Sequence, residues 1–428
     1  MDGRRPRSAA AGVVLAFTMV PGFAQEPMHD HSKMAGHGSM DHGMQMNEAG
    51  MYLMTMASGT SMNPQSWQMP MLAPKTGSWN LMFMGQAYLV DTQQSGPRGG
   101  DKLYAPNWFM GSVEHAVGKG AVMLQTMVSL DPATITDRRY PLLFQTGETA
   151  YGKPLTDAQH PHDLLMGIGI HYARPLAEGT MLQLYYAPIG DPGLGPVAFP
   201  HRASAAELPQ ATLGHHWQDS THIASNVATV ALKHKWIRLE ASGFYGTEPN
   251  ENRWNIDWGP MNSYSGRVSI FPAKNWMGQF SMGKLTKPEE LEEGNVVRTT
   301  ASLHYTKPVS GTNAWSTSFI WGRNRRTQRS LDSFLVETVY PVSRRNFLTG
   351  RAESVDKDEL FANHPEIEHG RAFRIGAYTA GYTRDVGAYK SVVAGVGANI
   401  TAYTAPPALK PYYGDHPWGV NVYVRFRL

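Results

Sequence analysis

The sequence predicts an all-β protein: an antiparallel β-barrel of about 16 strands (about 14 to 18) that spans an outer membrane and follows a disordered N-terminal tail. Three observations predict this class: a start typical of exported proteins, alternating apolar and polar residues in many segments, and connections that are short and long in turn. Such alternation gives each strand one apolar and one polar face. A soluble β-sandwich or propeller is the alternative, although a propeller should show one repeat for each blade.

Residues 1–24 have the order of a secretory signal peptide. Arg4, Arg5 and Arg7 precede an apolar run over 9–20, and small residues follow up to Ala24. Cleavage is therefore expected after Ala24. No other stretch reaches the roughly 18 apolar residues that a membrane-spanning helix requires. We therefore expect a transmembrane barrel in the outer membrane of a Gram-negative bacterium, with its tail in the periplasm.

Residues 25–50 form a polar tail that is expected to be disordered and to bind metal. The stretch 28–46, "MHDHSKMAGHGSMDHGMQM", holds four histidines and five methionines, and the chain has no cysteine. Thioethers favour Cu(I) and Ag(I), and imidazole suits several transition metals. A polar linker with incidental methionines is the alternative, but 11 of the 23 methionines lie between Met28 and Met71. The candidate ligands here are His29, His31, Met34, His37, Met40, His42, Met44 and Met46.

Residues 51–75 are less polar and still rich in methionine, which predicts a linker or a periplasmic plug segment. Residues 76–428 are predicted to be the barrel. In the last strand, Val420, Val422, Val424 and Phe426 share one face. Similar alternation starts at Trp79, where Leu81, Phe83 and Leu89 share a face, and recurs at Val297–Tyr305 and Val392–Ile400.

The predicted connections are short at one end of the barrel and long at the other, as in outer-membrane barrels. The short turns are expected at 117–120, 174–180, 233–236, 272–275, 341–345 and 385–388. The long loops are expected at about 91–102, 131–163, 188–222, 246–262, 286–295, 323–331, 355–370 and 404–417.

Two of these loops, 131–163 and 188–222, concentrate histidines beside carboxylates and are long enough to fold into the lumen. Histidine and carboxylate together can build a metal site. The alternative is a hydrogen-bonded plug in which the same side chains only pack. His171 and His304 lie on polar strand faces and should point into the lumen as ordinary hydrogen-bonding residues. The candidate loop ligands are His160, His162, Asp163, His201, His215, His216, Asp219 and His222.

Two resemblances add to this interpretation. The tail, around Asp41–Met44, resembles the Met/His-rich N-terminal segments of the copper-resistance B family of outer-membrane proteins. The body resembles a poorly characterised group of bacterial outer-membrane β-barrels, through "QHPHD" (159–163), "PIGDPGLGP" (188–196), "HRASA" (201–205), "LGHHWQDSTHI" (213–223) and "ENRWNID" (251–257). The first resemblance implies copper handling, and the second implies architecture.

The function predicted from these features is the binding, sequestration or passage of copper or silver ions, without an organic cofactor and without enzymatic activity. The expected partners are outer-membrane lipid, the metal ions and periplasmic metal-efflux components. Nucleic acid is excluded because 38 Lys and Arg nearly balance 35 Asp and Glu. A general porin-like channel or structural barrel is the alternative. A lipid hydrolase built on Ser220, with Asp219 and either His216 or His222, is the third hypothesis.

Overall fold

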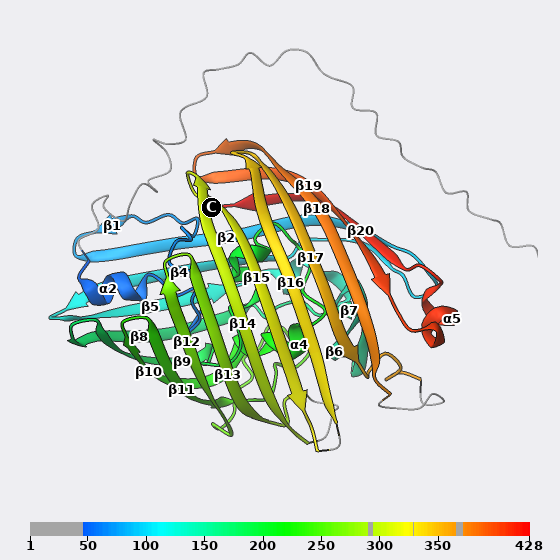
Figure 1. The fold of residues 1–428 in the computed structure, drawn as a ribbon, viewed down its shortest axis with the longest axis horizontal. Helices are drawn as coiled ribbons and strands as arrows, with labels where there is room; N and C mark the ends of the chain where they lie inside the picture. The colour runs from blue at the N-terminus through cyan, green and yellow to red at the C-terminus, as the bar shows by residue number, and fades with distance from the viewer. Residues whose placement is uncertain (1–45, 290–293, 328, 365–370) are drawn as a thin grey trace, which may run out of the picture.

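The computed structural model describes residues 46–289, 294–327, 329–364 and 371–428. Within them, sixteen strands form a closed antiparallel barrel, because the first long strand pairs with both the second and the last (Figure 1). Closure leaves no sheet edge exposed to lipid. The barrel strands are β2 (Trp79–Gln94), β4 (Asn107–Val117), β5 (Gly120–Val128), β8 (Leu165–Ala177), β9 (Thr180–Gly190), β10 (Ala224–His234), β11 (Ile237–Tyr245), β12 (Ser263–Ala273), β13 (Trp276–Thr286), β14 (Asn295–Ser310), β15 (Asn313–Arg325), β16 (Ser330–Ser343), β17 (Asn346–Lys357), β18 (Phe373–Tyr389), β19 (Val392–Thr404) and β20 (Trp418–Arg427).

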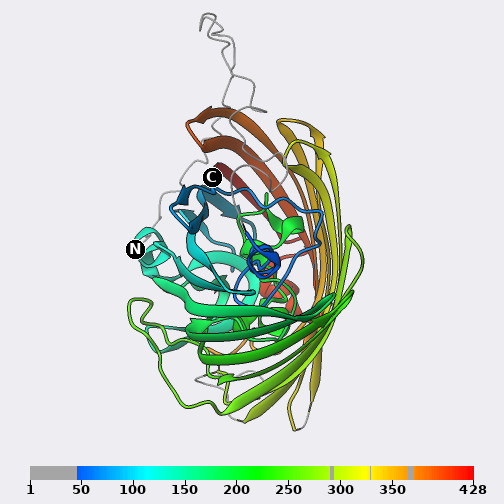
Figure 2. The ribbon, with the colours of Figure 1, turned by 90° about the vertical axis from the view of Figure 1, so that its left-hand side faces the viewer.

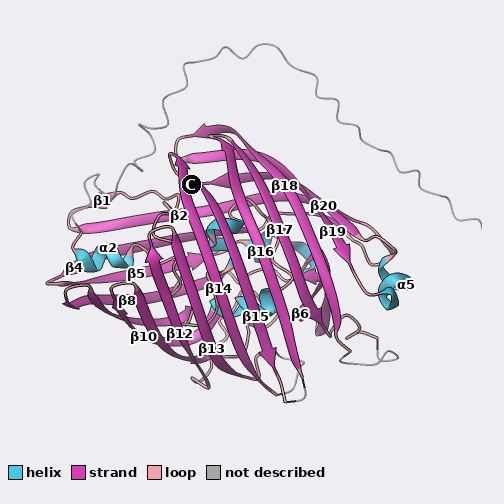
Figure 3. Ribbon diagram, viewed as in Figure 1, coloured by secondary structure: helices cyan, strands magenta, loops and turns pink. Residues whose placement is uncertain are grey.

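Short elements accompany the barrel, and Figure 3 shows two of them, α2 and α5, towards opposite ends of it. Two short strands extend the sheet beside β2, and two others pair only with each other. No helix among the described residues is long and apolar enough to cross a membrane. These elements are α2 (Glu48–Leu53), β1 (Lys75–Thr76), β3 (Asp101–Tyr104), α3 (Asp131–Thr134), η1 (Thr136–Arg138), β6 (Tyr140–Ala150), β7 (Lys153–Gln159), η2 (Phe199–His201), η3 (Ala203–Ala205), α4 (His215–Gln218), η4 (Ser220–Ile223), η5 (Pro407–Leu409) and α5 (Lys410–Tyr413).

The alternation read from the sequence is confirmed. Along β2, Trp79, Phe83 and Leu89 are exposed outward, and along β20 the outward residues include Val422 and Phe426. An apolar outer surface is what a barrel in lipid requires. Aromatic side chains also contact one another beside the short turns: the ring centroids of the consecutive pairs are 4.6, 5.4 and 6.0 Å apart in the row Trp276, Tyr305, Trp315 and Tyr340.

The connections follow the predicted alternation of short and long, with four differences. The connection between β15 and β16, expected as a long loop at 323–331, spans only 326–329. The stretch 385–388 lies inside β18 at a bulge, and the turn comes at 390–391. A further short turn joins β14 to β15 at 311–312. The long loop 131–163 folds its second half into the hairpin β6–β7, because its residues pair with each other and pack in the barrel interior.

Three segments lie within the ring of strands and are called the plug here: residues 46–72, 140–159 and 191–223 (Figure 2). The first enters at the short-turn end, where Asn47 Nδ2 donates to the Gly120 carbonyl at 2.8 Å. The same Asn47 caps α2, so residues 47–50 of the range 25–50 that the sequence assigned to the tail belong to a helix and its cap. The third segment is tied to the wall where Gly193 N and Gly195 N donate to Ser242 and Ser281.

Candidate functional site

Five of the six loop histidines predicted as ligands lie close together inside the barrel, while the sixth, His201, contacts Trp108 instead. The ring of His215 lies 5.2 Å from that of His216 and 5.3 Å from that of His222, and His160 is 5.8 Å from His216. His162 closes the group, 5.7 Å from His222. The two loops therefore meet, as their lengths predicted.

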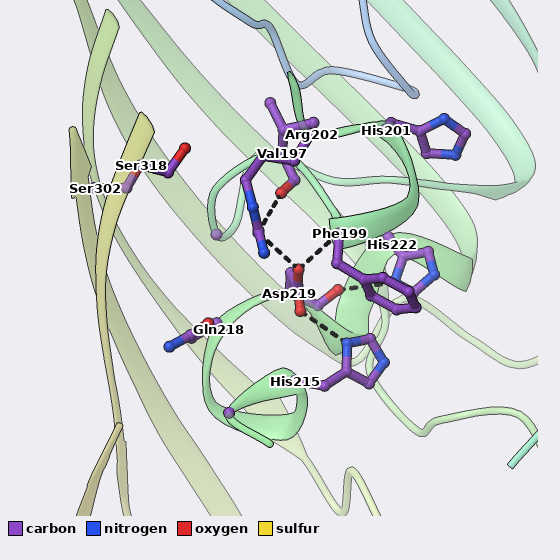
Figure 4. A network of polar contacts seen from close by, with 12 residues as sticks. Val197, Phe199, His201, Arg202, His215, Gln218, Asp219, His222, Ser302 and Ser318 are labelled. Atoms are coloured by element: carbon purple, nitrogen blue, oxygen red, sulfur yellow. Dashed lines mark hydrogen bonds and ion pairs between the residues drawn. The ribbon is translucent and has the colours of Figure 1, made fainter. Parts of the chain in front are cut away.

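Asp219 organises one side of this group (Figure 4). One carboxylate oxygen accepts from His215 Nδ1 at 2.7 Å. The other accepts from the backbone N–H of Phe199 at 2.9 Å and from Arg202 at 3.2 Å. Although burial alone would raise the pKa of Asp219, the His215 hydrogen bond and the positive charge of Arg202 hold it below its usual range. Asp219 is therefore an ionised anchor that fixes the start and end of the segment 199–219.

The other histidines pair with carboxylates that the sequence analysis did not consider. His160 Nε2 lies 2.9 Å from Glu148, and His216 Nδ1 lies 3.2 Å from Glu248. His162 Nδ1 lies 3.0 Å from Asp131. In the described parts of the chain, no three His, Asp and Glu side chains are arranged to hold a metal ion. These distant carboxylates carried no signal in the sequence, because none is close to its histidine along the chain.

Burial keeps the plug histidines neutral. Desolvation lowers the pKa of His201 to about 3 and that of His215 to about 4, and it lowers the pKa of His222 well below the usual value. Both ring nitrogens of His201 and Nε2 of His222 have no hydrogen-bond partner. Asp163 is also buried without a hydrogen-bond partner for its carboxylate oxygens, and desolvation raises its pKa to about 8.

Methionines line one side of the lumen, a feature that the sequence analysis did not single out. Five adjacent strands, β2, β4, β5, β8 and β9, turn buried methionines inward where outer-membrane barrels are ordinarily polar. Their polar-face positions in β2 could have been found from "LMFMG", since Met82 and Met84 alternate with outward residues. We call this surface the methionine wall; its residues are Met82, Met84, Met110, Met123, Met127, Met166 and Met181.

Plug methionines pack against this wall. Met54, Met56 and Met62 join a buried cluster with residues of β2, β5 and β9. Met69 and Met71 are partly buried against a second cluster on β2, β4, β5 and β8. The thioethers of plug and wall therefore form an apolar, sulfur-rich zone inside the barrel.

Ion pairs line the other side of the lumen. Glu337 on β16 accepts from Arg202 of the plug at 2.5 Å and from Arg351 on β17 at 3.0 Å. Glu240 on β11 accepts from Arg267 on β12 at 2.8 Å, and Arg267 also donates to the plug. We call this surface the ion-pair wall; its residues are Arg238, Glu240, Arg267, Glu337, Arg351 and Arg425.

Ser220, the nucleophile of the lipid-hydrolase hypothesis, is occupied by other partners. Its hydroxyl donates to Glu248 at 2.6 Å and accepts from Arg298 at 2.8 Å. His222 Nδ1 instead faces the Asp219 carbonyl at 2.8 Å. The hydroxyl proton is therefore given to the Glu248 carboxylate, in the loop between β11 and β12, and no histidine among the described residues accepts it.

The remaining predicted site residues are placed as follows. Met46 is partly buried against the N-terminal methionine cluster. His171 and His304 are buried in the lumen with side-chain partners, as expected. The signal peptide lies outside the described residues, as do seven tail candidates: His29, His31, Met34, His37, Met40, His42 and Met44.

Comparisons with known proteins identify the fold. Neither a protein-family model nor a curated protein sequence matches this chain. OmpF of Salmonella typhi, solved in complex with daunomycin, is 9% identical, with a TM-score of 0.51; the match covers 83% of this chain and 100% of that one. An anion-selective porin from Comamonas acidovorans is 9% identical, with a TM-score of 0.49, and covers 82% and 100%. OmpT of Vibrio cholerae is 8% identical, with a TM-score of 0.47, and covers 83% and 100%. At such low identity the likeness to OmpF shows the fold alone: this chain is an outer-membrane β-barrel with a porin-like fold.

Proposed function

We propose that this barrel handles soft monovalent metal ions, Cu(I) or Ag(I), at the outer membrane of a Gram-negative bacterium. One observation carries the proposal: the methionine wall, which places thioethers in a lumen where polar side chains are the rule. Thioethers prefer Cu(I) and Ag(I) over hard cations. Methionine also serves as an adaptable packing residue, so the proposal needs a metal-binding test.

The tail and the wall would act in sequence. The described chain starts at Met46, at the short-turn end and against the methionine-rich part of the plug, and the proposed metal-binding tail precedes it in the sequence. The tail would collect the ion in the periplasm, and the lumen would hold it or pass it on. Its resemblance to the copper-resistance B family supports the same role.

The test is an Ag(I) titration of the mature full-length protein in detergent. It is compared with a full-length variant whose tail histidines and methionines up to Met44 are replaced by Gln and Ser. Keeping Met46 and Asn47 preserves the packing and the helix cap of the folded segment. We expect the wild type to bind more Ag(I) than the variant, and cells that produce the wild type to tolerate more silver. If the wild type and the variant bound the same number of Ag(I) ions and gave cells the same silver tolerance, the tail would have no part in the proposed function.

The alternative, a general porin-like channel, requires a path for solutes through the lumen. Three plug segments occupy much of the lumen, among them the buried residues 191–223. Single-channel recording in planar bilayers separates the two functions. Stable ohmic conductance in the wild type, together with no Ag(I) binding, would favour the channel.

A further inference from the structure

A small cavity lies where the third plug segment meets the methionine wall. Its lining includes Met110, Met127 and Met166 from β4, β5 and β8, together with His222 and Asp191 from the plug. Its volume is about 10 Å³, the space of one water molecule or one ion. The three methionines are at most 4% exposed.

His222, one of the lining residues, has a ring nitrogen without a hydrogen-bond partner. Its Nδ1 lies 2.8 Å from the Asp219 carbonyl, which can only accept, so Nδ1 carries the proton. The opposite nitrogen, Nε2, is buried and has no hydrogen-bond partner. A buried polar atom without a partner has lost its hydrogen bonds to water, so its presence calls for a ligand or another explanation. Histidines that ligate metals are commonly held in this way, through a hydrogen bond at the other ring nitrogen.

The donor set suits one class of ion. Three thioethers and a neutral imidazole are soft or intermediate ligands, which favour Cu(I) and Ag(I) over Mg²⁺ or Ca²⁺. The Asp191 carboxyl also lines the cavity, where it accepts from Ser58 Oγ at 3.2 Å, and could balance the charge of a cation. Met69 packs against the same methionine cluster and also lines a larger cavity of about 70 Å³ beside His201.

We propose that Met110, Met127, Met166 and His222 form a lumenal binding site for a single Cu(I) or Ag(I) ion. This inference deepens the proposed function and rests on it, because it names the place in the barrel where the ion is held. The site joins two parts of the chain that the sequence analysis treated separately, the wall strands and the histidine loop 188–222.

The test follows methionine methyl groups by NMR in the mature full-length protein, labelled at the methionine ¹³C-methyl and titrated with Ag(I) in detergent. Individual resonances separate tail ligands from lumenal ligands in the same sample. Met127→Leu removes one thioether while keeping apolar volume. Met277→Leu is the matched control, since Met277 is likewise buried on the inward face of β13 but belongs neither to the methionine wall nor to the cavity lining.

We expect the resonances of Met110, Met127 and Met166 to shift together and to saturate at one ion per site. Met127→Leu should weaken Ag(I) binding at this site by about tenfold or more, while Met277→Leu should leave it unchanged. The lumenal site is overturned if these three resonances stay fixed, or if both variants behave alike. Shifts confined to tail methionines would leave the proposed function standing without this site. No shift at any methionine would reject both.

Discussion

The two walls of the lumen hold the same plug by opposite means. The ion-pair wall uses charge: the fully buried Glu337 joins Arg202 of the plug to Arg351 of the barrel. The methionine wall uses dispersion and apolar burial, as where the fully buried Met166 packs among other methionines. A buried charge requires an exact partner, whereas a thioether tolerates varied neighbours. The ion-pair wall therefore fixes the position of the plug, whereas the methionine wall tolerates changes in the atoms packed against it.

The largest expected effect comes from breaking the ion-pair wall. Glu337→Gln leaves two buried guanidinium groups without their shared carboxylate. We expect the free energy of unfolding to fall by about 3–5 kcal/mol, since removing one partner of a buried pair leaves uncompensated charge. Urea unfolding in detergent measures this.

Asp332→Asn is the control for that variant. Asp332 pairs with Arg323, whose side chain is 45% exposed, and a pair of this kind contributes less than about 1 kcal/mol. If the two variants lost equal stability, the ion-pair wall would not be what holds the plug.

In the methionine wall, the free energy of unfolding should depend on the volume of the buried side chain rather than on its sulfur atom. Met166→Ala creates a cavity beside the plug, and we expect it to cost about 2–5 kcal/mol. Met166→Leu keeps the volume and should cost less than about 1.5 kcal/mol. Both values come from the same urea titrations. A leucine variant as unstable as the alanine variant would mean that the sulfur atom itself contributes to folding.

The smallest expected effect concerns pH, at the buried plug residue His201. The pKa of His201 is about 3 in the folded protein and about 6.5 in the unfolded chain. Between these two pH values the unfolded chain protonates His201, whereas the folded protein keeps it neutral. Stability from this group is therefore lost as pH falls below about 6.5. His201→Phe removes the titration, so its stability relative to wild type should rise by about 1 kcal/mol between pH 7 and pH 5.5.

The comparison with His201→Phe isolates one group among several that titrate. Desolvation raises the pKa of Asp163 to about 8, and the folded protein therefore gains stability from that carboxyl as pH falls. This opposite contribution is common to both proteins and cancels in the difference. If the difference in free energy of unfolding between His201→Phe and the wild type stayed constant with pH, His201 would not be buried as a neutral ring.

Much of the barrel could be predicted because its signal is local. Alternation fixed which face of β20 meets lipid, since Val422 and Phe426 differ from their neighbours in polarity. The turn at 385–388 was misplaced because a glycine-containing stretch marks a bulge as readily as a turn. The hairpin β6–β7 was taken for a loop because it packs inside the barrel as part of the plug. It therefore lacks the alternating apolar outer face of a membrane-spanning strand.

The candidate site was predicted only in part. The histidine loops were correctly expected to fold inward, but their partners Glu148 and Glu248 lie far away along the chain. The inward methionines could be read from alternation in β2, yet nothing local assigned them a role.

The strand faces, the order of short and long connections, and a tail composition that favours soft metals could all be predicted from the sequence. Each of these depends on neighbouring residues, through the two-residue period of a strand or through polarity alone. That His222 lines the same cavity as Met110, Met127 and Met166 could be seen only in the folded structure. That meeting depends on ring closure and on a loop packed inside the ring. The physical reason is that lipid forces every backbone group to pair within the barrel, and closure then brings distant strands and loops together.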